Sequence, residues 1–228
     1  MRPIGILGGM GPQATVLLMQ KVIDAVPAQD DADHIPLIVH QNPAVPSRIK
    51  ALIDGTGPSP VPVLRRMVRD LESAGAQALA MPCNTAHVYT AEICGATELP
   101  FLDMLAATAL ALVDKGRIGI LASPATRLTG IFDSYLPGSH HTPEDDGPVL
   151  EMIRAVKAGA PASRIAAPLE QEAQRLLEQC DHILIACTEL SLAAPQLSEE
   201  IPWTDSLDCL TAQIVDFAAP KVRMKAAQ

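Results

Sequence analysis

The sequence predicts an α/β fold made of two pseudo-symmetric, three-layer halves with mainly parallel sheets and an active site in the cleft between them. Short apolar runs alternate with amphipathic stretches along the chain, and this alternation is typical of parallel strands joined by helices. Hydrophobic residues make up 48% of the chain but aromatic residues only 3%. Ala, Leu, Ile and Val must therefore form the core, which suits helices packed on a buried parallel sheet.

The elements follow from the spacing of the apolar residues. Strands are expected at Ile4–Leu7, Pro36–His40, Gln77–Met81, Ile118–Leu121 and His182–Ala186. Helices are expected at Gln13–Val26, Val61–Ala74, Ala107–Asp114, Ala125–Tyr135, Ala166–Gln179 and Ser206–Ala218. The polar segment Gly138–Gly147 predicts a surface loop, and its adjacent His140 and His141 are expected to be solvated rather than bound to metal.

A faint internal repeat predicts the two halves. The run Ile4–Leu7 (Ile-Gly-Ile-Leu) recurs 114 residues later, and an apolar strand ends in Cys-Asn-Thr at Cys83 and in Cys-Thr at Cys187. We expect a first domain of residues 1–104 and 207–228 that carries Cys83, and a second domain of residues 105–206 that carries Cys187. In this division the last helix returns to the first half.

Charge and cysteine usage exclude several classes of function. The formal net charge is −9 and no Lys/Arg run is present, so neither nucleic acid nor an anionic membrane surface is an expected partner. The absence of a signal peptide or a long apolar span, together with an odd number of cysteines, predicts a cytoplasmic protein with reduced thiols. No cysteine spacing resembles a zinc site, and no metal is expected.

The first turn is rich in glycine. Gly8–Pro12 follows the first expected strand and opens a helix, where free N–H groups favour an anion. The spacing Gly9-x-Gly11-x-x-Ala14 also matches a relaxed dinucleotide fingerprint. However, the next strand ends in His-Gln-Asn without the acid that holds a ribose. A cradle for a small carboxylate is favoured, and a tight turn without a ligand stays open.

Cys83 and Cys187 differ from the other three cysteines. Cys94, Cys180 and Cys209 are expected to be small buried side chains, whereas these two follow apolar strands at the ends where parallel sheets bind ligands. A helix start after each is expected to lower the thiol pKa. Two opposed thiols can remove a proton from one face of a carbon and return one to the other face.

Such a reaction leaves a carbanion that needs stabilising. Backbone N–H groups near Gly8–Gly11 and Cys187–Glu189 are candidates, together with the side chains of Asn84, Thr85 and Thr188. His87, four residues after Cys83, could help to set the thiol pKa, and helix capping or core packing are equally open for it.

Three motifs resemble the aspartate/glutamate racemase superfamily, in its aspartate racemase branch. They are Ile-Leu-Gly-Gly-Met-Gly-Pro at 6–12, Pro-Cys-Asn-Thr-Ala-His at 82–87 and Ala-Cys-Thr-Glu-Leu at 186–190. The resemblance covers nearly the whole chain. It implies an amino-acid racemase that acts on aspartate or glutamate without pyridoxal phosphate or metal, as a homodimer with a small-molecule substrate.

The resemblance also assigns residues. Cys83 and Cys187 match the catalytic pair. The matching substrate-site positions are Met10, Arg48, Asn84, Thr85, Thr126, Lys157, Thr188 and Glu189. Arg48 and Lys157 suit an acidic substrate, because a cation can bind its distal carboxylate. Ser123-Pro124-Ala125 departs from the family pattern, which leaves the substrate's identity open.

Two other functions remain open from the residues. One is a cysteine-dependent isomerase or decarboxylase of a small dicarboxylate on the same scaffold. The other is a non-catalytic protein that binds an amino acid and has no unusually reactive thiol.

Overall fold

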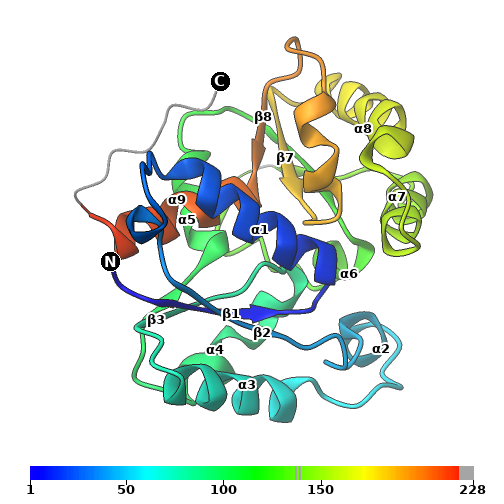
Figure 1. Cartoon of the computed structure of the whole chain (residues 1–228). Helices are drawn as coiled ribbons and strands as arrows, with labels where there is room; N and C mark the ends of the chain where they lie inside the picture. Colours follow the sequence, from blue (N-terminus) through cyan, green and yellow to red (C-terminus); the bar gives the residue numbers. More distant parts are fainter. Residues whose placement is uncertain (137, 139, 221–228) are drawn as a thin grey trace.

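Two four-stranded parallel sheets form the framework of the protein (Figure 1). The computed structural model describes residues 1–136, 138 and 140–220. The first sheet contains β1 (Ile4–Gly8), β2 (Leu37–Gln41), β3 (Ala78–Ala80) and β4 (Phe101–Leu102) in the order β2-β1-β3-β4. The second contains β5 (Ile118–Ala122), β6 (His140–His141), β7 (His182–Ala186) and β8 (Trp203–Asp205) in the order β6-β5-β7-β8. The two orders are equivalent, and the predicted α/β fold is confirmed.

The helices alternate with these strands along the chain, and the last helix follows β8. They are α1 (Pro12–Ala25), α2 (Arg48–Leu52), α3 (Val61–Ser73), α4 (Thr90–Cys94), α5 (Met104–Ala111), α6 (Pro124–Leu128), α7 (Gly147–Lys157), α8 (Ala162–Leu177) and α9 (Ser206–Ala218). Short 3-10 turns occupy Asp31–Asp33, Thr85–Tyr89, Leu190–Leu192 and Ala194–Gln196. Over the described ranges, none of the helices combines the length and the apolar character needed to cross a membrane.

Helices cover both faces of each sheet. In the first half, α1 and α9 bury apolar side chains on one face of the sheet, and α3 covers the other. In the second half, α7 and α8 cover one face and α5 the other. The helix that follows the last strand of each sheet therefore packs on the other sheet: α5 follows β4 but lies on the second sheet, and α9 follows β8 but lies on the first.

Several local predictions need correction. The helix expected at 125–135 ends at Leu128, because Gly130 adopts a φ of +60° that leaves the helical region. The segment at 138–147 is not all loop: His140 and His141 form β6, which pairs with Ile118 and Gly119 of β5. Residue 139 of that segment, and residues 221–228 of the expected first domain, lie outside the described residues.

The side chains of two further residues are not where they were expected. His140 is half-buried rather than fully solvated, and its Nε2 lies 3.2 Å from a carboxylate oxygen of Asp133. Cys94 was expected to be buried but is exposed on α4. The sequence pattern gave no warning, because a two-residue strand and a five-residue helix are too short to show a period.

Candidate active site

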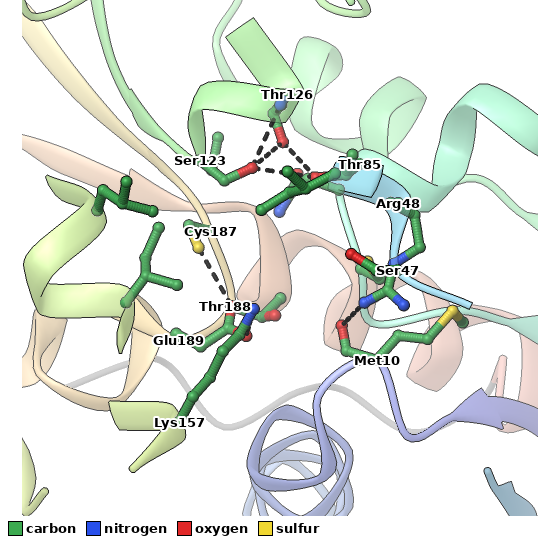
Figure 2. Close-up of a pocket in the computed structure, with 16 residues that line it drawn as sticks. Met10, Ser47, Arg48, Thr85, Ser123, Thr126, Lys157, Cys187, Thr188 and Glu189 are labelled. Carbon is green, nitrogen blue, oxygen red and sulfur yellow. Dashed lines mark hydrogen bonds and ion pairs between the residues drawn. The ribbon is translucent and has the colours of Figure 1, made fainter. Parts of the chain in front are cut away.

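A small cavity of about 60 Å³ lies at the carboxyl ends of the strands of both sheets (Figure 2). This is the edge at which parallel α/β sheets place their ligands. All ten residues predicted for the site line the cavity: Met10, Arg48, Cys83, Asn84, Thr85, Thr126, Lys157, Cys187, Thr188 and Glu189. Six other lining residues were not predicted from the sequence: Ser47, Ile49, Ser123, Leu150, Ile153 and Ala186.

The two predicted catalytic cysteines occupy equivalent places in the two halves. Cys83 lies just beyond β3, and Cys187 follows β7 directly. β3 and β7 hold the same position in their sheets, each beside the first strand of its half. Both thiols are free and only 6% exposed. The repeat therefore brings one thiol from each half to the same cavity.

Cys187 belongs to a short chain of charged and polar groups. Its Sγ donates a hydrogen bond to Oε2 of Glu189 at 3.2 Å, and Oε1 of Glu189 lies 3.5 Å from Nζ of Lys157. Burial raises the pKa of Cys187 well above its usual range, and the negative charge of Glu189 raises it further. The expected lowering of this pKa by a helix start is therefore wrong for Cys187, which rests as a thiol.

His87 holds the backbone of the Cys83 loop. Its Nε2 accepts a hydrogen bond from the backbone N–H of Met104 at 3.3 Å, so Nδ1 carries the proton and donates it to the carbonyl of Cys83 at 2.8 Å. Burial lowers the pKa of His87, which favours the neutral ring. Both ring nitrogens are used, so His87 acts on the loop rather than on the thiol.

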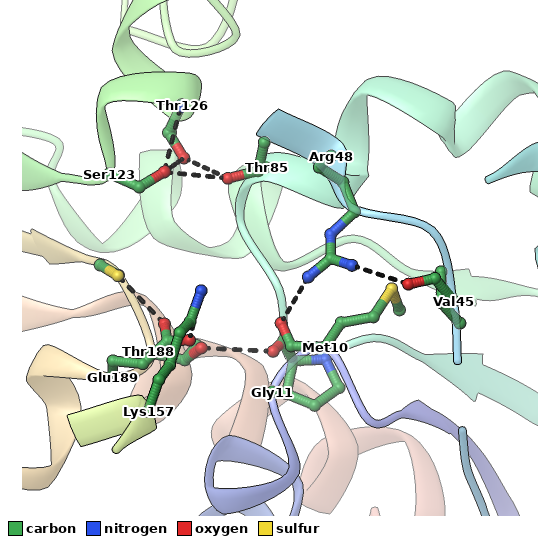
Figure 3. Close-up of polar contacts among 12 residues, drawn as sticks. Met10, Gly11, Val45, Arg48, Thr85, Ser123, Thr126, Lys157, Thr188 and Glu189 are labelled. Carbon is green, nitrogen blue, oxygen red and sulfur yellow. Dashed lines mark hydrogen bonds and ion pairs between the residues drawn. The ribbon is translucent and has the colours of Figure 1, made fainter. Parts of the chain in front are cut away.

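Two cations come to the cavity from different halves. Arg48 begins α2, and its guanidinium donates to the carbonyls of Met10 at 3.4 Å and Val45 at 3.5 Å (Figure 3). It also donates to the carbonyl of Pro46 at 3.1 Å. Lys157 ends α7 in the second half and pairs with Glu189. The three carbonyls fix the plane of the guanidinium, which suits a fork that binds a carboxylate.

Three hydroxyl groups join the halves at one end of the cavity (Figure 2). Thr85 Oγ1 lies 2.6 Å from Thr126 Oγ1 and 3.1 Å from Ser123 Oγ, and Ser123 and Thr126 are 3.0 Å apart. Ser123 also caps α6 by accepting the N–H of Thr126. Pro124 occupies the first turn of that helix, where a missing N–H is harmless. The departure at 123–125 thus leaves a hydroxyl at the cavity.

The glycine-rich turn is shaped by close packing. Gly9 has a φ of +93°, and a Cβ there would lie 2.4 Å from the backbone carbon of Asn42. Its N–H donates to Thr15 Oγ1 at 2.9 Å, so this donor is not available to an anion. The turn reaches the cavity through Met10, whose carbonyl orients Arg48.

Fold and cavity together define the class of protein: an α/β protein of two repeated halves with a small polar site between them. A family model described as Asp/Glu/hydantoin racemase matches residues 7–214. The chain belongs to this family of racemases, which are isomerases, and the predicted family and enzyme class are confirmed.

Individual relatives agree with the family. The structure of Picrophilus torridus aspartate racemase is 30% identical, covers 99% of this chain and 96% of its own, and superimposes with a TM-score of 0.87. The broad specificity amino-acid racemase RacX of Bacillus subtilis is 29% identical over 68% of this chain and 70% of its own. An aspartate racemase homologue from Pyrococcus horikoshii, at 21% identity and a TM-score of 0.69, covers 96% of this chain and 100% of its own and shares the fold.

Proposed function

We propose that the protein racemises aspartate or glutamate without a cofactor, by a two-base mechanism in which Cys83 and Cys187 act on opposite faces of the α-carbon. The observation that carries the proposal is that both thiols, one from each half, line one small cavity. The similarity to an aspartate racemase over nearly the whole chain supports it.

The protonation of Cys187 supports a direction for the first proton transfer. Because the pKa of Cys187 is raised well above its usual range, its S–H is the proton donor at rest, and Cys83 must begin as the thiolate. The Cys83 thiolate removes the α-proton, the electron pair moves into the carboxylate, and Cys187 then protonates the opposite face. Cys83 ends as the thiol and Cys187 as the thiolate, so this form accepts the other enantiomer.

Arg48 and Lys157 support an acidic substrate. A substrate with two carboxylates offers one negative charge to each cation, and the two cations come from different halves. The ion pair of Lys157 with Glu189 is 3.5 Å long, so a substrate carboxylate can compete for Lys157. We propose that Met10, Asn84, Thr85, Thr126, Thr188 and Glu189 form the rest of the substrate site.

We also propose the domain organisation around this site. The first domain comprises residues 1–104 with 207–228, and the second residues 105–206. The packing of α9 on the first sheet and of α5 on the second supports this division. We further propose a homodimer that acts in the cytoplasm; five free cysteines suit a reducing compartment.

Exchange of the α-hydrogen tests the proposal directly. The protein is incubated with L- and D-aspartate and L- and D-glutamate in deuterated water, proton NMR follows loss of the α-hydrogen, and a chiral assay follows inversion. We expect exchange with inversion, abolished by Cys83→Ser and by Cys187→Ser. Cys94→Ser is the matched control, because Cys94 is exposed and lies outside the cavity.

Other outcomes would redirect the assignment. Absence of exchange with all four amino acids would contradict the substrate assignment and favour an isomerase or decarboxylase of another small dicarboxylate. Binding without exchange, and without a reactive thiol that substrate protects, would favour a non-catalytic binding protein.

Arg48→Gln should raise KM for aspartate more than it lowers kcat, because it removes a binding contact to a carboxylate.

A further inference from the structure

A group of buried polar residues connects the loops of the two cysteines outside the cavity itself. Asp205 ends β8 and caps α9, and it is only 1% exposed. Its Oδ1 accepts hydrogen bonds from Ser191 Oγ at 2.8 Å and from the N–H of Leu207 at 2.9 Å. Its Oδ2 has no partner among the described residues. A buried carboxylate with an unpaired oxygen is costly to fold around, so its presence needs an explanation.

On one side Asp205 restrains the Cys187 loop. Ser191 lies four residues after Cys187 and is fully buried. Its backbone N–H donates to the carbonyl of Cys187 at 3.2 Å, while its hydroxyl donates to Asp205. One serine therefore ties the Cys187 backbone to the start of α9.

On the other side the same helix start restrains the Cys83 loop. Ser206 directly follows Asp205, and its hydroxyl accepts a hydrogen bond from Nδ2 of Asn84 at 3.0 Å. Asn84 directly follows Cys83 and lines the cavity. The dipeptide Asp205-Ser206 thus contacts the loops of both thiols, and α9 packs on the sheet that carries Cys83.

The first half has a related arrangement. Asp103 caps α5 by accepting the N–H groups of Leu105 and Ala106. His87, four residues after Cys83, places Nε2 4.0 Å from Oδ1 of Asp103. In both halves, therefore, an aspartate that caps the helix packed on the other sheet (α5 or α9) lies beside the fourth residue after the cysteine. Of these two acidic caps, Asp205 with Ser206 contacts both cysteine loops, whereas Asp103 lies beside the Cys83 loop.

We propose that Asp205 is a positioning residue that holds the Cys83 and Cys187 loops at a fixed separation across the cavity. The inference rests on the proposed two-thiol mechanism. Proton transfer to and from one carbon requires both sulfur atoms at close range from opposite sides. A displacement of about 1 Å can cost about 100-fold in rate. A fully buried hydrogen-bonded network is suited to fix such a distance.

Ser191→Ala and Asp205→Leu test the role. Ser191→Ala removes only the hydroxyl that joins the Cys187 loop to Asp205, and Asp205→Leu removes the acceptor at similar volume. Thr211→Val is the matched control, because it removes a buried hydroxyl of α9 that donates to the carbonyl of Leu207 and does not line the cavity. We expect kcat per folded protein to fall about tenfold or more in the first two variants, with KM nearly unchanged, and to stay unchanged in Thr211→Val.

A second readout does not depend on racemase activity. A short bis-alkylating reagent is used to bridge Cys83 and Cys187, and the bridged peptide is quantified by mass spectrometry. Bridging should be slower in Ser191→Ala than in wild type and in Thr211→Val. If the wild type bridges but does not racemise, the proposed function fails while this readout still decides the positioning role. Wild-type rates of both bridging and turnover in Ser191→Ala, or no bridging in wild type, would overturn the inference.

Discussion

Replacing Asp205 by Asn should change the free energy of unfolding in a pH-dependent way. The difference between variant and wild type should favour the variant more above pH 7 than near pH 4. Burial raises the pKa of Asp205 from 3.8 to about 7. The native state therefore binds a proton that the unfolded chain releases at lower pH. The favourable contribution of the protonated form is complete below pH 3.8 and is lost as the pH rises to about 7.

The size of the effect follows from the shift. One pKa unit corresponds to about 1.4 kcal/mol, so a shift of about three units gives an upper value of about 4 kcal/mol. Asp205 is almost fully buried, so solvent screens it little. Asp208 on the same helix also raises the pKa of Asp205. The hydrogen bond from the N–H of Leu207, the charge of Lys21 on α1 and the hydrogen bond from Ser191 lower it. Burial raises the pKa of nearby Cys209 to about 11, so its thiol stays neutral over this range.

Urea unfolding of both proteins from pH 4 to pH 8.5 measures the effect. Asn keeps the acceptor oxygen for Ser191 and Leu207, and its amide replaces the oxygen without a partner. An unpaired amide adds an offset of about 1–3 kcal/mol that does not vary with pH. The stability difference, variant minus wild type, should therefore rise by up to about 1.4 kcal/mol per pH unit between about pH 4 and pH 7 and then level off.

Asp181→Asn is a control of opposite sign. The exposed carboxyl of Asp181 has its pKa lowered to about 2 by hydrogen bonds from Arg117, so its difference curve should be flat above pH 5. A flat curve for Asp205→Asn between about pH 4 and pH 7 would refute the buried, raised-pKa assignment.

Three further predictions concern the cavity and its support. Glu189→Gln should lower the pKa of Cys187, because the carboxylate charge that raises it is gone; alkylation of Cys187 at pH 8.5 should be faster than in wild type, and slower labelling would contradict the assignment. Gly9→Ala should cost about 2–5 kcal/mol in urea unfolding, from its positive φ and a backbone clash, whereas Gly75→Ala, with a similar φ but open space, should cost only about 1–2 kcal/mol. His87→Phe should cost about 2–5 kcal/mol by leaving a buried carbonyl and a buried N–H unpaired; a loss below about 1 kcal/mol would show that water replaces them.

The long buried strands could be predicted because their sequences are continuous apolar runs. β1, β5 and β7 each hold five buried residues, and each begins where the sequence predicted it. β4, β6 and β8 are only two or three residues long. Such strands form because a neighbouring strand supplies hydrogen bonds, and that neighbour is not visible in a local sequence window. The sequence did not predict α7 for a different reason: the helix begins at Gly147, the last residue of a segment rich in loop-forming residues.

The site was predictable where its chemistry is written into motifs and not where it depends on packing. Both cysteines and the cations lie in recognisable segments, and all line the cavity. Ser123 and Asp205 carry no such signal, because their roles arise from partners distant in the sequence. The raised pKa of Cys187 was also hidden, since burial and the position of Glu189 determine it.

The repeat places two thiols at one cavity, but the residues around them differ in a way that matters for catalysis. Glu189 lies two residues after Cys187, and Thr85 lies two residues after Cys83. Glu189 accepts the hydrogen bond from the thiol of Cys187, whereas the hydroxyl of Thr85 is hydrogen-bonded to the hydroxyls of Ser123 and Thr126. In the proposed mechanism an exact two-fold site would not favour either thiol as the initial acid. The carboxylate in one half removes that ambiguity, so the resting enzyme should process one enantiomer first, and a proton must return to Cys187 before that enantiomer is turned over again.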